Sequence, residues 1–171
     1  MFTFASLSKT QESAISQVEL VVMKDEEYMK IAIEEAKKAE LEGEVPIGAI
    51  VVDTDGKIIA RAHNLREQLQ SPAAHAEHIA VEEASKVKQA WRLTGCTVYV
   101  TLEPCIMCSG LMHQARIDRC VFGAYDKKAG ALVTLYKVAE DTRLNHNFEV
   151  KGGVLEKECA TLLSQFFKKR R

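Results

Sequence analysis

The length, composition and charge of this chain are those of an ordinary single-domain globular protein. It has 171 residues, of which 47% are hydrophobic and 27% charged, so it can bury one substantial core. Its 23 Lys and Arg residues and 24 Asp and Glu residues give a net charge of −1, which excludes a strongly basic nucleic-acid binder. Any contact with nucleic acid must come from a local basic patch.

The first 22 residues differ from the rest of the chain. They mix Ser and Gln with scattered apolar residues, and they lack the basic start and long apolar run of a signal peptide. We expect residues 1–22 to be a tail of unknown role, with Met23 as an alternative start, followed by one domain over residues 23–171. No apolar run approaches the length of a membrane span.

The domain is predicted to begin with a helix and a hairpin. Asp25 can cap a helix that runs to about Glu42, and Gly43 then ends it. The continuous apolar run 47–52 predicts a strand covered on both faces. A short turn then leads into a second strand over residues 57–63, so the pair is predicted to be an antiparallel hairpin.

The middle of the chain predicts two further helices and two strands. A polar loop over residues 64–73 leads to a helix over about 74–87. The β-favouring run 97–101 predicts a strand, and Pro104 opens the next helix, at a position where proline is tolerated. Another strand over residues 120–123 completes a strand–helix–strand unit, which should be parallel.

The C-terminal part has weaker patterns until its last helix. Residues 135–141 indicate a short helix and residues 148–151 a short strand. Together these elements predict an α/β fold, with helices on both faces of a central mixed sheet of roughly five strands in three α/β/α layers. The final helix carries one apolar stripe: Leu155, Cys159, Leu162, Leu163, Phe166 and Phe167.

Two short motifs form a set of metal ligands. His75-Ala76-Glu77 stands at the start of one predicted helix, and Pro104-Cys105-Ile106-Met107-Cys108 opens another. One imidazole and two thiolates are a set that zinc takes in tetrahedral geometry. Because His75, Cys105 and Cys108 supply only three ligands, a fourth position stays open for water, which is typical of a catalytic zinc.

Glu77 is the predicted proton carrier. It lies two residues from His75, close enough to reach a water at the metal without being a ligand itself. A carboxylate there can take a proton from the attacking water and pass it to a ring nitrogen and then to a departing amino group. The motifs therefore predict hydrolytic deamination. A structural zinc site would need a fourth ligand, for which His78 and His113 are the candidates.

The other three cysteines have no part in this site. Five cysteines are an odd number, and Cys96, Cys120 and Cys159 each stand inside an apolar run. Such residues are usually buried free thiols rather than members of a disulfide framework. This usage is typical of a reducing compartment and predicts a cytoplasmic protein.

Several other residues have simple structural interpretations when each is taken alone. Asn64 follows a strand and would be a turn residue. Asp126 stands in a Lys-containing loop that would be solvated. The C-terminal Lys-Lys-Arg-Arg suits the end of a helix, and Phe166 and Phe167 would first of all face the core.

A longer pattern extends the two metal motifs. Its segments are Glu44-Val45-Pro46-Ile47-Gly48-Ala49, His63-Asn64, Thr101-Leu102-Glu103-Pro104-Cys105-Ile106-Met107-Cys108-Ser109-Gly110, Phe122-Gly123-Ala124, residues 126–131, Leu144-Asn145-His146 and the Phe166-Phe167-Lys168-Lys169-Arg170-Arg171 ending. From Tyr28 to Arg171 the chain resembles the bacterial tRNA-specific adenosine deaminases, within the wider cytidine deaminase-like superfamily. One departure is Leu132-Val133-Thr134, where that family usually has a small Gly- and Ser-containing stretch.

This resemblance implies conversion of adenosine to inosine at the wobble position of a tRNA anticodon, chiefly that of an arginine tRNA. It also implies one Zn²⁺ per subunit and a homodimer whose active sites are bordered by the partner subunit. His75, Cys105 and Cys108 would hold zinc, and Glu77 would shuttle protons. In the same family pattern Asn64 would hydrogen-bond the base and Asp126 a ribose hydroxyl. Ala76 and Pro104 would also bind the substrate, and Asn145 would help to close the pocket. Phe167 with the basic tail would lie against the anticodon loop.

Two rival functions remain open from the sequence. The first is a deaminase that acts on a free base or nucleoside, such as guanine or cytosine. The second is a zinc-bearing RNA-binding subunit without catalysis of its own. Ammonia release from an anticodon stem-loop, compared with release from free bases and nucleosides, distinguishes a tRNA deaminase from the first rival. The effect of a Glu77 substitution on turnover distinguishes an enzyme from the second rival.

Overall fold

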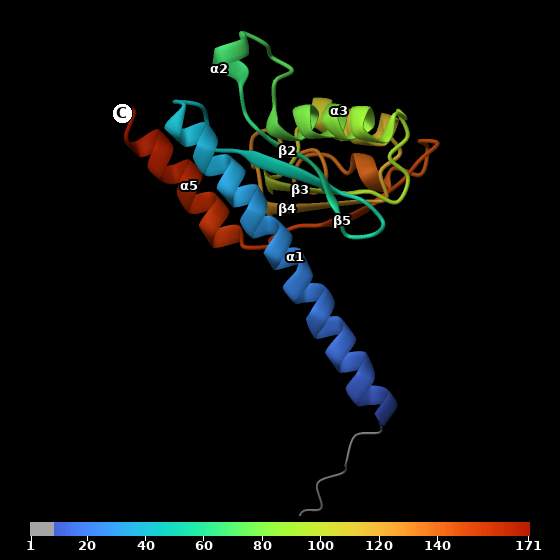
Figure 1. Ribbon diagram of the computed structural model, residues 1–171. Helices are drawn as coiled ribbons and strands as arrows, with labels where there is room; N and C mark the ends of the chain where they lie inside the picture. The colour runs from blue at the N-terminus through green and yellow to red at the C-terminus, as the bar shows by residue number, and fades with distance from the viewer. Residues whose placement is uncertain (1–8) are drawn as a thin grey trace, which may run out of the picture.

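A computed structural model describes the backbone of residues 9–171 and the side chains from Lys24 onward. One five-stranded sheet is covered on both faces by helices (Figure 1). This confirms the predicted three-layer α/β/α fold with a mixed sheet. The elements are α1 Lys9–Leu41, β1 Gly48–Val52, β2 Ile58–His63, α2 Arg66–Leu69, α3 Ala76–Lys88, β3 Thr97–Leu102, α4 Ile106–Gln114, β4 Arg119–Ala124, the 3₁₀ helix η1 Val138–Glu140, β5 Glu149–Lys151 and α5 Glu156–Lys168.

The sheet has the strand order β2-β1-β3-β4-β5. Strand β1 pairs antiparallel with both β2 and β3, so the predicted hairpin is confirmed. Strands β3, β4 and β5 run parallel, as the strand–helix–strand pattern predicted for the first two of them. Val100 lies opposite Ala49 on one side and Phe122 on the other, at the centre of the sheet. Central strands of this kind are buried on both faces, which explains their apolar composition.

Two hydrophobic clusters fill the space on either side of the sheet. Helices α3 and α4 cover one face through residues such as Ala80 and Met112. Helices α1 and α5 cover the other through residues such as Met29 and Cys159. Every residue of β1 is buried, as the continuous apolar run predicted. Cys96, Cys120 and Cys159 are buried free thiols, which confirms the interpretation of their apolar surroundings.

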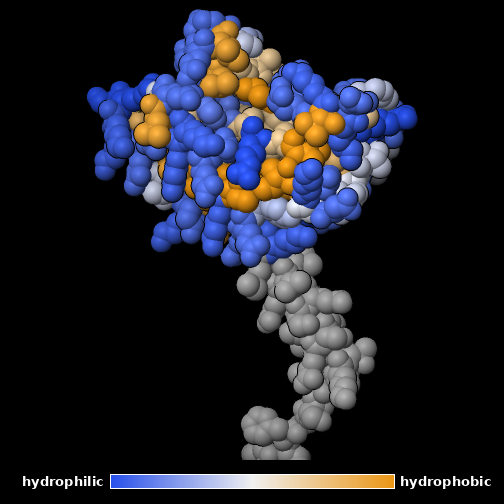
Figure 2. Space-filling view, viewed as in Figure 1, coloured by the Kyte–Doolittle hydropathy of each residue, from blue (hydrophilic) through white to orange (hydrophobic). Residues whose placement is uncertain are grey.

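The side of the molecule seen in Figure 2 is mostly hydrophilic, with apolar side chains gathered in a band near its centre. None of the helices in the described part of the chain is long and apolar enough to cross a membrane.

The sequence was wrong about the start of the first helix. Helix α1 begins at Lys9, so Asp25 lies inside it and does not cap it. Gly43 does follow the end of α1, with a φ of +79° that suits glycine. Helix α1 continues across the expected boundary between residues 22 and 23. The assignment of residues 1–22 as a separate tail stays a prediction.

Asp25 has long-range partners in place of a local capping role. Its carboxylate is 2% exposed and accepts hydrogen bonds from the Tyr99 hydroxyl, two nitrogens of Arg119 and Lys151 Nζ. Although burial opposes ionisation, these partners lower the pKa of Asp25 to about 2. Glu149 also contacts Arg119, at 3.1 Å, and completes an ion-pair network that ties α1 to β3, β4 and β5.

Three other elements differ from the predictions. The loop predicted over residues 64–73 contains the short helix α2, whose first amides bond to the distant Glu44 carboxylate. The short helix expected over 135–141 is only the 3₁₀ turn η1, with Ala139 as its one buried residue. The apolar stripe of α5 is also narrower than expected, because Cys159 and Phe166 are buried whereas Phe167 is 50% exposed.

Removal of the Asp25 charge should destabilise the protein. In Asp25→Asn the Arg119 and Lys151 cations lose their buried partner, so we expect a loss of about 2 kcal/mol and about 5 °C in Tm. A carboxyl group whose pKa is lowered by folding stabilises the protein above its unfolded-state pKa of 3.8, and this contribution fades as pH falls toward about 2. Urea unfolding of both proteins at pH 7, 4 and 2.5 should therefore show a difference that shrinks with acid. An equal difference at all three pH values would contradict this assignment.

Candidate metal centre and active site

The predicted metal ligands stand at the N-terminal ends of two helices. His75 is the N-cap residue of α3, and Cys105 is the N-cap residue of α4, both with extended backbone. Neither side chain forms a capping hydrogen bond to the helix that it begins. Cys108 follows in the first turn of α4 and is fully buried. Because helix N-termini carry unpaired N–H groups and a positive dipole end, this junction stabilises thiolates.

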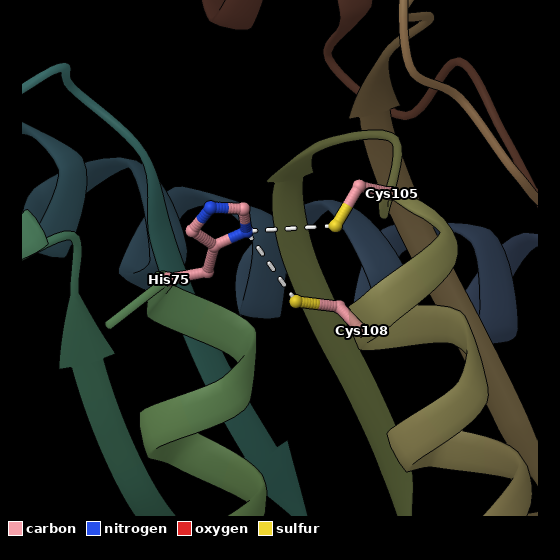
Figure 3. Close-up of side chains that lie close together, drawn as sticks. All are labelled: His75, Cys105 and Cys108. Atoms are coloured by element: carbon pink, nitrogen blue, oxygen red, sulfur yellow. Dashed lines mark hydrogen bonds between the residues drawn. The ribbon is translucent and has the colours of Figure 1, made fainter. Parts of the chain in front are cut away.

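The imidazole and both sulfurs face one another (Figure 3). His75 Nδ1 lies 3.6 Å from Cys105 Sγ and 3.5 Å from Cys108 Sγ. Zinc bonds of about 2.3 Å to sulfur and about 2.05 Å to nitrogen, set at the tetrahedral angle, require nitrogen–sulfur separations of about 3.6 Å. The three ligand atoms all lie within 4.8 Å of one another. Donor set and spacing therefore both fit a tetrahedral zinc ion bound through Nδ1.

The two cysteine sulfurs and the His75 imidazole lie close enough to change one another's affinity for protons. Hydrogen bonding from Cys108, followed by that from His75, lowers the pKa of Cys105 to about 3. The hydrogen bond to Cys105 and burial raise the pKa of Cys108 instead. The Cys105 contact also raises the pKa of His75. His75, Cys105 and Cys108 would hold a divalent cation in place of these protons, the two sulfurs as thiolates and the imidazole as a neutral ligand.

Glu77 is buried beside this cluster and is not part of it. The side chain is 5% exposed in the first turn of α3. Burial raises the pKa of its carboxyl group, and the charge of Glu77 contributes to the raised pKa of Cys108. The three-residue ligand group does not include it. The structure therefore places a carboxyl group next to the metal centre, in a position outside its ligand set.

Neither alternative fourth ligand joins the cluster. His78 lies on α3 with its Nε2 atom 3.6 Å from the Glu82 carboxylate. His113 is buried on α4 near His146, with ring centroids 6.2 Å apart. Among the described residues, the one metal-binding group of three or more His, Cys, Asp or Glu side chains is His75, Cys105 and Cys108. The arrangement is that of a catalytic site with an open position rather than of a closed structural site.

Asn64 is buried near the metal centre, and its side chain is already engaged. Its Nδ2 donates to the Val45 carbonyl oxygen, and its Oδ1 accepts from the Arg66 amide. The next residue, Leu65, donates its amide to the carbonyl oxygen of Ala74, which directly precedes His75. The two remaining pocket predictions, Ala76 and Pro104, are buried neighbours of ligands in the sequence.

Asp126 lies close to the Cys105 turn, and Asn145 lies on a different, exposed segment. The Asp126 amide faces the Glu103 carboxylate at 3.4 Å, and its own Oδ1 accepts from the amides of Lys128 and Ala129. Asn145 is exposed between η1 and β5, and no hydrogen bond within residues 24–171 joins its side chain to the metal ligands. Its predicted role in closing the pocket stays a prediction.

The basic C-terminus is partly tied to the domain. Arg170 stacks on the Phe166 ring at 4.2 Å and donates to the carbonyl oxygen of Gly43, just beyond α1. Phe167 packs edge-on against Phe166 but leaves half of its surface exposed. Because Glu44 next to Gly43 binds the start of α2, the end of α5 lies at the same end of the molecule as α2 (Figure 1).

The sequence did not single out two buried carboxylates near the site. Glu44 is 1% exposed and accepts hydrogen bonds from the amides of Glu67 and Gln68 at the start of α2. Glu103 is 2% exposed and bonds to the loop over residues 126–134. In the sequence, each of these acidic residues stands within four positions of a predicted buried strand and within two of a proline. A charge that becomes buried at such a position requires partners, which is the signal that could have identified them.

Comparison with known proteins agrees with this geometry. Residues 22–124 match the family model of the cytidine and deoxycytidylate deaminase zinc-binding region. A tRNA-specific adenosine deaminase of Bacillus subtilis is 55% identical over 147 residues, covering 86% of this chain and 91% of the relative.

Two solved structures are also similar. One, from work on A-to-I editing by tRNA:A34 deaminases, superposes with a TM-score of 0.77 at 39% identity and covers 80% of this chain and 99% of the other. A guanine deaminase from Bacillus subtilis gives a TM-score of 0.56 at 36% identity, covering 58% of this chain and 64% of the other. The identity and the coverage of both chains are higher for the two adenosine deaminases than for the guanine deaminase. The predicted ligands His75, Cys105 and Cys108 lie within the region that the family model matches. On these grounds the chain belongs to the tRNA-specific adenosine deaminase family.

Proposed function

We propose that this protein converts adenosine to inosine at the wobble position of a tRNA anticodon by zinc-dependent hydrolytic deamination. The observation that carries the proposal is the spacing of His75 Nδ1 and the two cysteine sulfurs, which fits one zinc ion and leaves Glu77 beside it. The strong similarity to adenosine deaminases that act on tRNA supports the substrate class. An arginine tRNA is the first substrate to examine.

Each residue at the site has a distinct part in this reaction. His75, Cys105 and Cys108 would hold zinc, which acts as a Lewis acid and increases the acidity of a water molecule at its open position. Glu77 takes the proton of the attacking water and delivers it to the purine ring nitrogen beside the reacting carbon. It then helps to protonate the amino group, which leaves as ammonia while the carbonyl group of inosine forms. Its burial keeps bulk water from competing for these protons.

Substrate contacts follow from the residues around the metal centre. Asn64 offers a buried amide that would hydrogen-bond the base once its own contacts rearrange, and Asp126 offers its second carboxylate oxygen to a ribose hydroxyl. Ala76 and Pro104 would form apolar walls, and Asn145 would close the pocket. These contacts require an unstacked base, which a tRNA anticodon loop presents readily.

The test is ammonia release from a synthetic anticodon stem-loop of an arginine tRNA. We expect turnover of the stem-loop and none of free guanine, cytosine or adenosine at the same concentration. A stem-loop with guanosine at the wobble position is the matched control and should be inert. Turnover of only the free compounds would reject the tRNA assignment in favour of a base or nucleoside deaminase.

Phe167 should contribute to RNA binding and not to stability. Because its ring is 50% exposed at the end of α5, it can stack on an unpaired base, an interaction worth about 1–3 kcal/mol. Phe167→Ala should therefore raise the KM for the stem-loop about tenfold while Tm and zinc content stay unchanged. Phe166→Ala is the contrasting variant, since Phe166 is buried and its loss should lower Tm. An unchanged KM in Phe167→Ala would remove this residue from the RNA interface.

We further propose that the protein is a homodimer. Large apolar side chains are exposed on the segments that flank the Cys105 turn, where Ile106 is 57%, Leu135 51% and Tyr136 59% exposed. Such surfaces are common at interfaces between subunits. Sedimentation analysis should give twice the mass of the 19.1 kDa chain, and a monomer at micromolar concentration would contradict this.

We propose a cytoplasmic location, because free thiols persist in a reducing compartment. All five cysteines are free, and the two that face His75 must stay reduced to bind zinc.

A further inference from the structure

The Glu103 carboxylate occupies a buried position between the last residue of β3 and the metal ligand Cys105. The donors around it come from one distant segment of the chain, residues 126–134, which we call the clasp loop. Glu103 Oε2 accepts from the amides of Val133 at 3.2 Å and Thr134 at 3.0 Å. Oε1 accepts from the Thr134 hydroxyl and faces the Asp126 amide at 3.4 Å. Four donors thus converge on a side chain that is 2% exposed.

The clasp loop is closely fitted to this carboxylate. A Cβ atom on Gly130 would lie 2.1 Å from Glu103 Oε2, so only glycine allows the approach. The amide of Ala131 donates to the carbonyl oxygen of Pro104 at 2.9 Å, directly before Cys105. Leu132 is fully buried in the core. The loop is therefore fixed along its length to the turn that carries a metal ligand.

Leu132-Val133-Thr134, which differs from the family pattern expected from the sequence, is part of the same contact. Val133 and Thr134 supply three of the four donors to Glu103, and Leu132 anchors the loop in the hydrophobic core. These three residues thus anchor the loop through hydrogen bonds to Glu103 and through the hydrophobic core. Asp126, at the other end of the loop, is held through its amide by the same carboxylate.

We propose that Glu103 is a positioning residue of the active site, whose carboxylate fixes the clasp loop, and with it Asp126, relative to Cys105. The carboxylate reaches no substrate atom, and its effect passes through the loop. A carboxylate offers only acceptors and can satisfy all four donors, whereas an amide would turn its own N–H groups toward them. The inference rests on the proposed deaminase function for its kinetic consequence, but the anchoring of the loop can be measured without substrate.

The test is Glu103→Gln, compared with Asp25→Asn. Asp25 is also a buried carboxylate with several donors, but its partners Arg119 and Tyr99 lie toward the start of β3 and β4, away from the metal centre beyond the end of β3. Asp25→Asn thus controls for destabilisation alone. Hydrogen exchange, zinc content per chain and stem-loop kinetics are measured for both variants and the wild type.

In Glu103→Gln we expect the amides of Val133 and Thr134 to exchange at least tenfold faster, with zinc content unchanged. The kcat/KM should fall about 10–100-fold, because small displacements of positioning groups have effects of this size. Most of the loss should be in KM, since His75, Cys105, Cys108 and Glu77 keep their places. Loss of metal or of folded protein would instead lower kcat at constant KM. Asp25→Asn should keep kcat/KM within twofold of the wild type.

Gly130→Ala is the second variant, because its Cβ would lie 2.1 Å from Glu103 Oε2 and 2.6 Å from the Asp126 carbonyl oxygen. It thus disturbs the contact between the carboxylate and the clasp loop without changing the charge of Glu103. Gly130→Ala should show the same rise in KM as Glu103→Gln. It therefore tests the proposal even if Glu103→Gln does not yield folded protein. Unchanged exchange of the clasp loop in a folded variant, or an unchanged KM in either variant, would overturn the proposal. So would a loss of activity that only follows loss of zinc. If the wild type does not act on RNA, the proposed function fails, while the exchange data still report whether Glu103 holds the loop.

Discussion

Glu77→Gln should abolish turnover while the protein stays folded and keeps its zinc. The substitution preserves the shape of the side chain but removes the group that accepts and returns protons. Removal of a general acid–base group usually costs 10²–10⁴ in rate, and here one residue serves several proton transfers, so we expect kcat to fall by about 10⁴ or more. Single-turnover assays with the anticodon stem-loop measure the loss directly.

The zinc content and the stability of Glu77→Gln separate this role from a structural one. Glu77 lies outside the ligand group, so zinc should remain at one ion per chain. Because burial disfavours the charged form of its carboxyl group, the neutral amide should not lower Tm. Glu82→Gln, on the exposed side of the same helix, is the matched control and should have full activity. Substantial turnover by Glu77→Gln would remove the proton-transfer mechanism, and an inactive wild type would favour a non-catalytic RNA-binding subunit.

The elements that the sequence predicted well are those that are determined by residues close to one another in the chain. The apolar run of β1 and the turn that follows it contain their own hairpin signal. The clustering of His75, Cys105 and Cys108 was also predictable, because these residues occur in two short motifs at predicted helix starts. Helix formation then determines which way the side chains point. For these features, residues close in sequence determine the geometry.

The features that the sequence did not predict depend on partners far along the chain. Asp25 is compatible with a helix cap locally, but it lies inside a helix that begins at Lys9, and its partner Arg119 is 94 residues away. The short helix α2 forms where the distant Glu44 carboxylate satisfies its first amides. Glu103 likewise has no local signal for its contact with Thr134, 31 residues further on. Buried charges of this kind become interpretable only when the fold brings their donors together.

Cys105→Ser should remove zinc binding and, with it, activity. Serine keeps the size of the side chain but replaces a thiolate by a hydroxyl group, which is a poor zinc ligand at neutral pH. Only His75 and Cys108 would then remain, and two ligands hold zinc far more weakly than three. We expect less than a tenth of an equivalent of zinc after dialysis against a weak chelator, and turnover at least 10³-fold lower.

Loss of zinc should also affect stability, which gives a readout independent of activity. A metal that binds only the folded state stabilises it by mass action, by about 4 kcal/mol at a free concentration of 1,000 times its Kd. Cys105→Ser and the chelated wild type should therefore have the same lowered Tm, and added Zn²⁺ should restore only the wild type. Cys96→Ala is the matched control, because Cys96 is a buried thiol outside the ligand group and its loss should leave zinc content unchanged. A full equivalent of zinc in Cys105→Ser would mean that another ligand occupies the coordination position assigned to Cys105. The open coordination position, on which the deaminase mechanism depends, would then have to be reassigned.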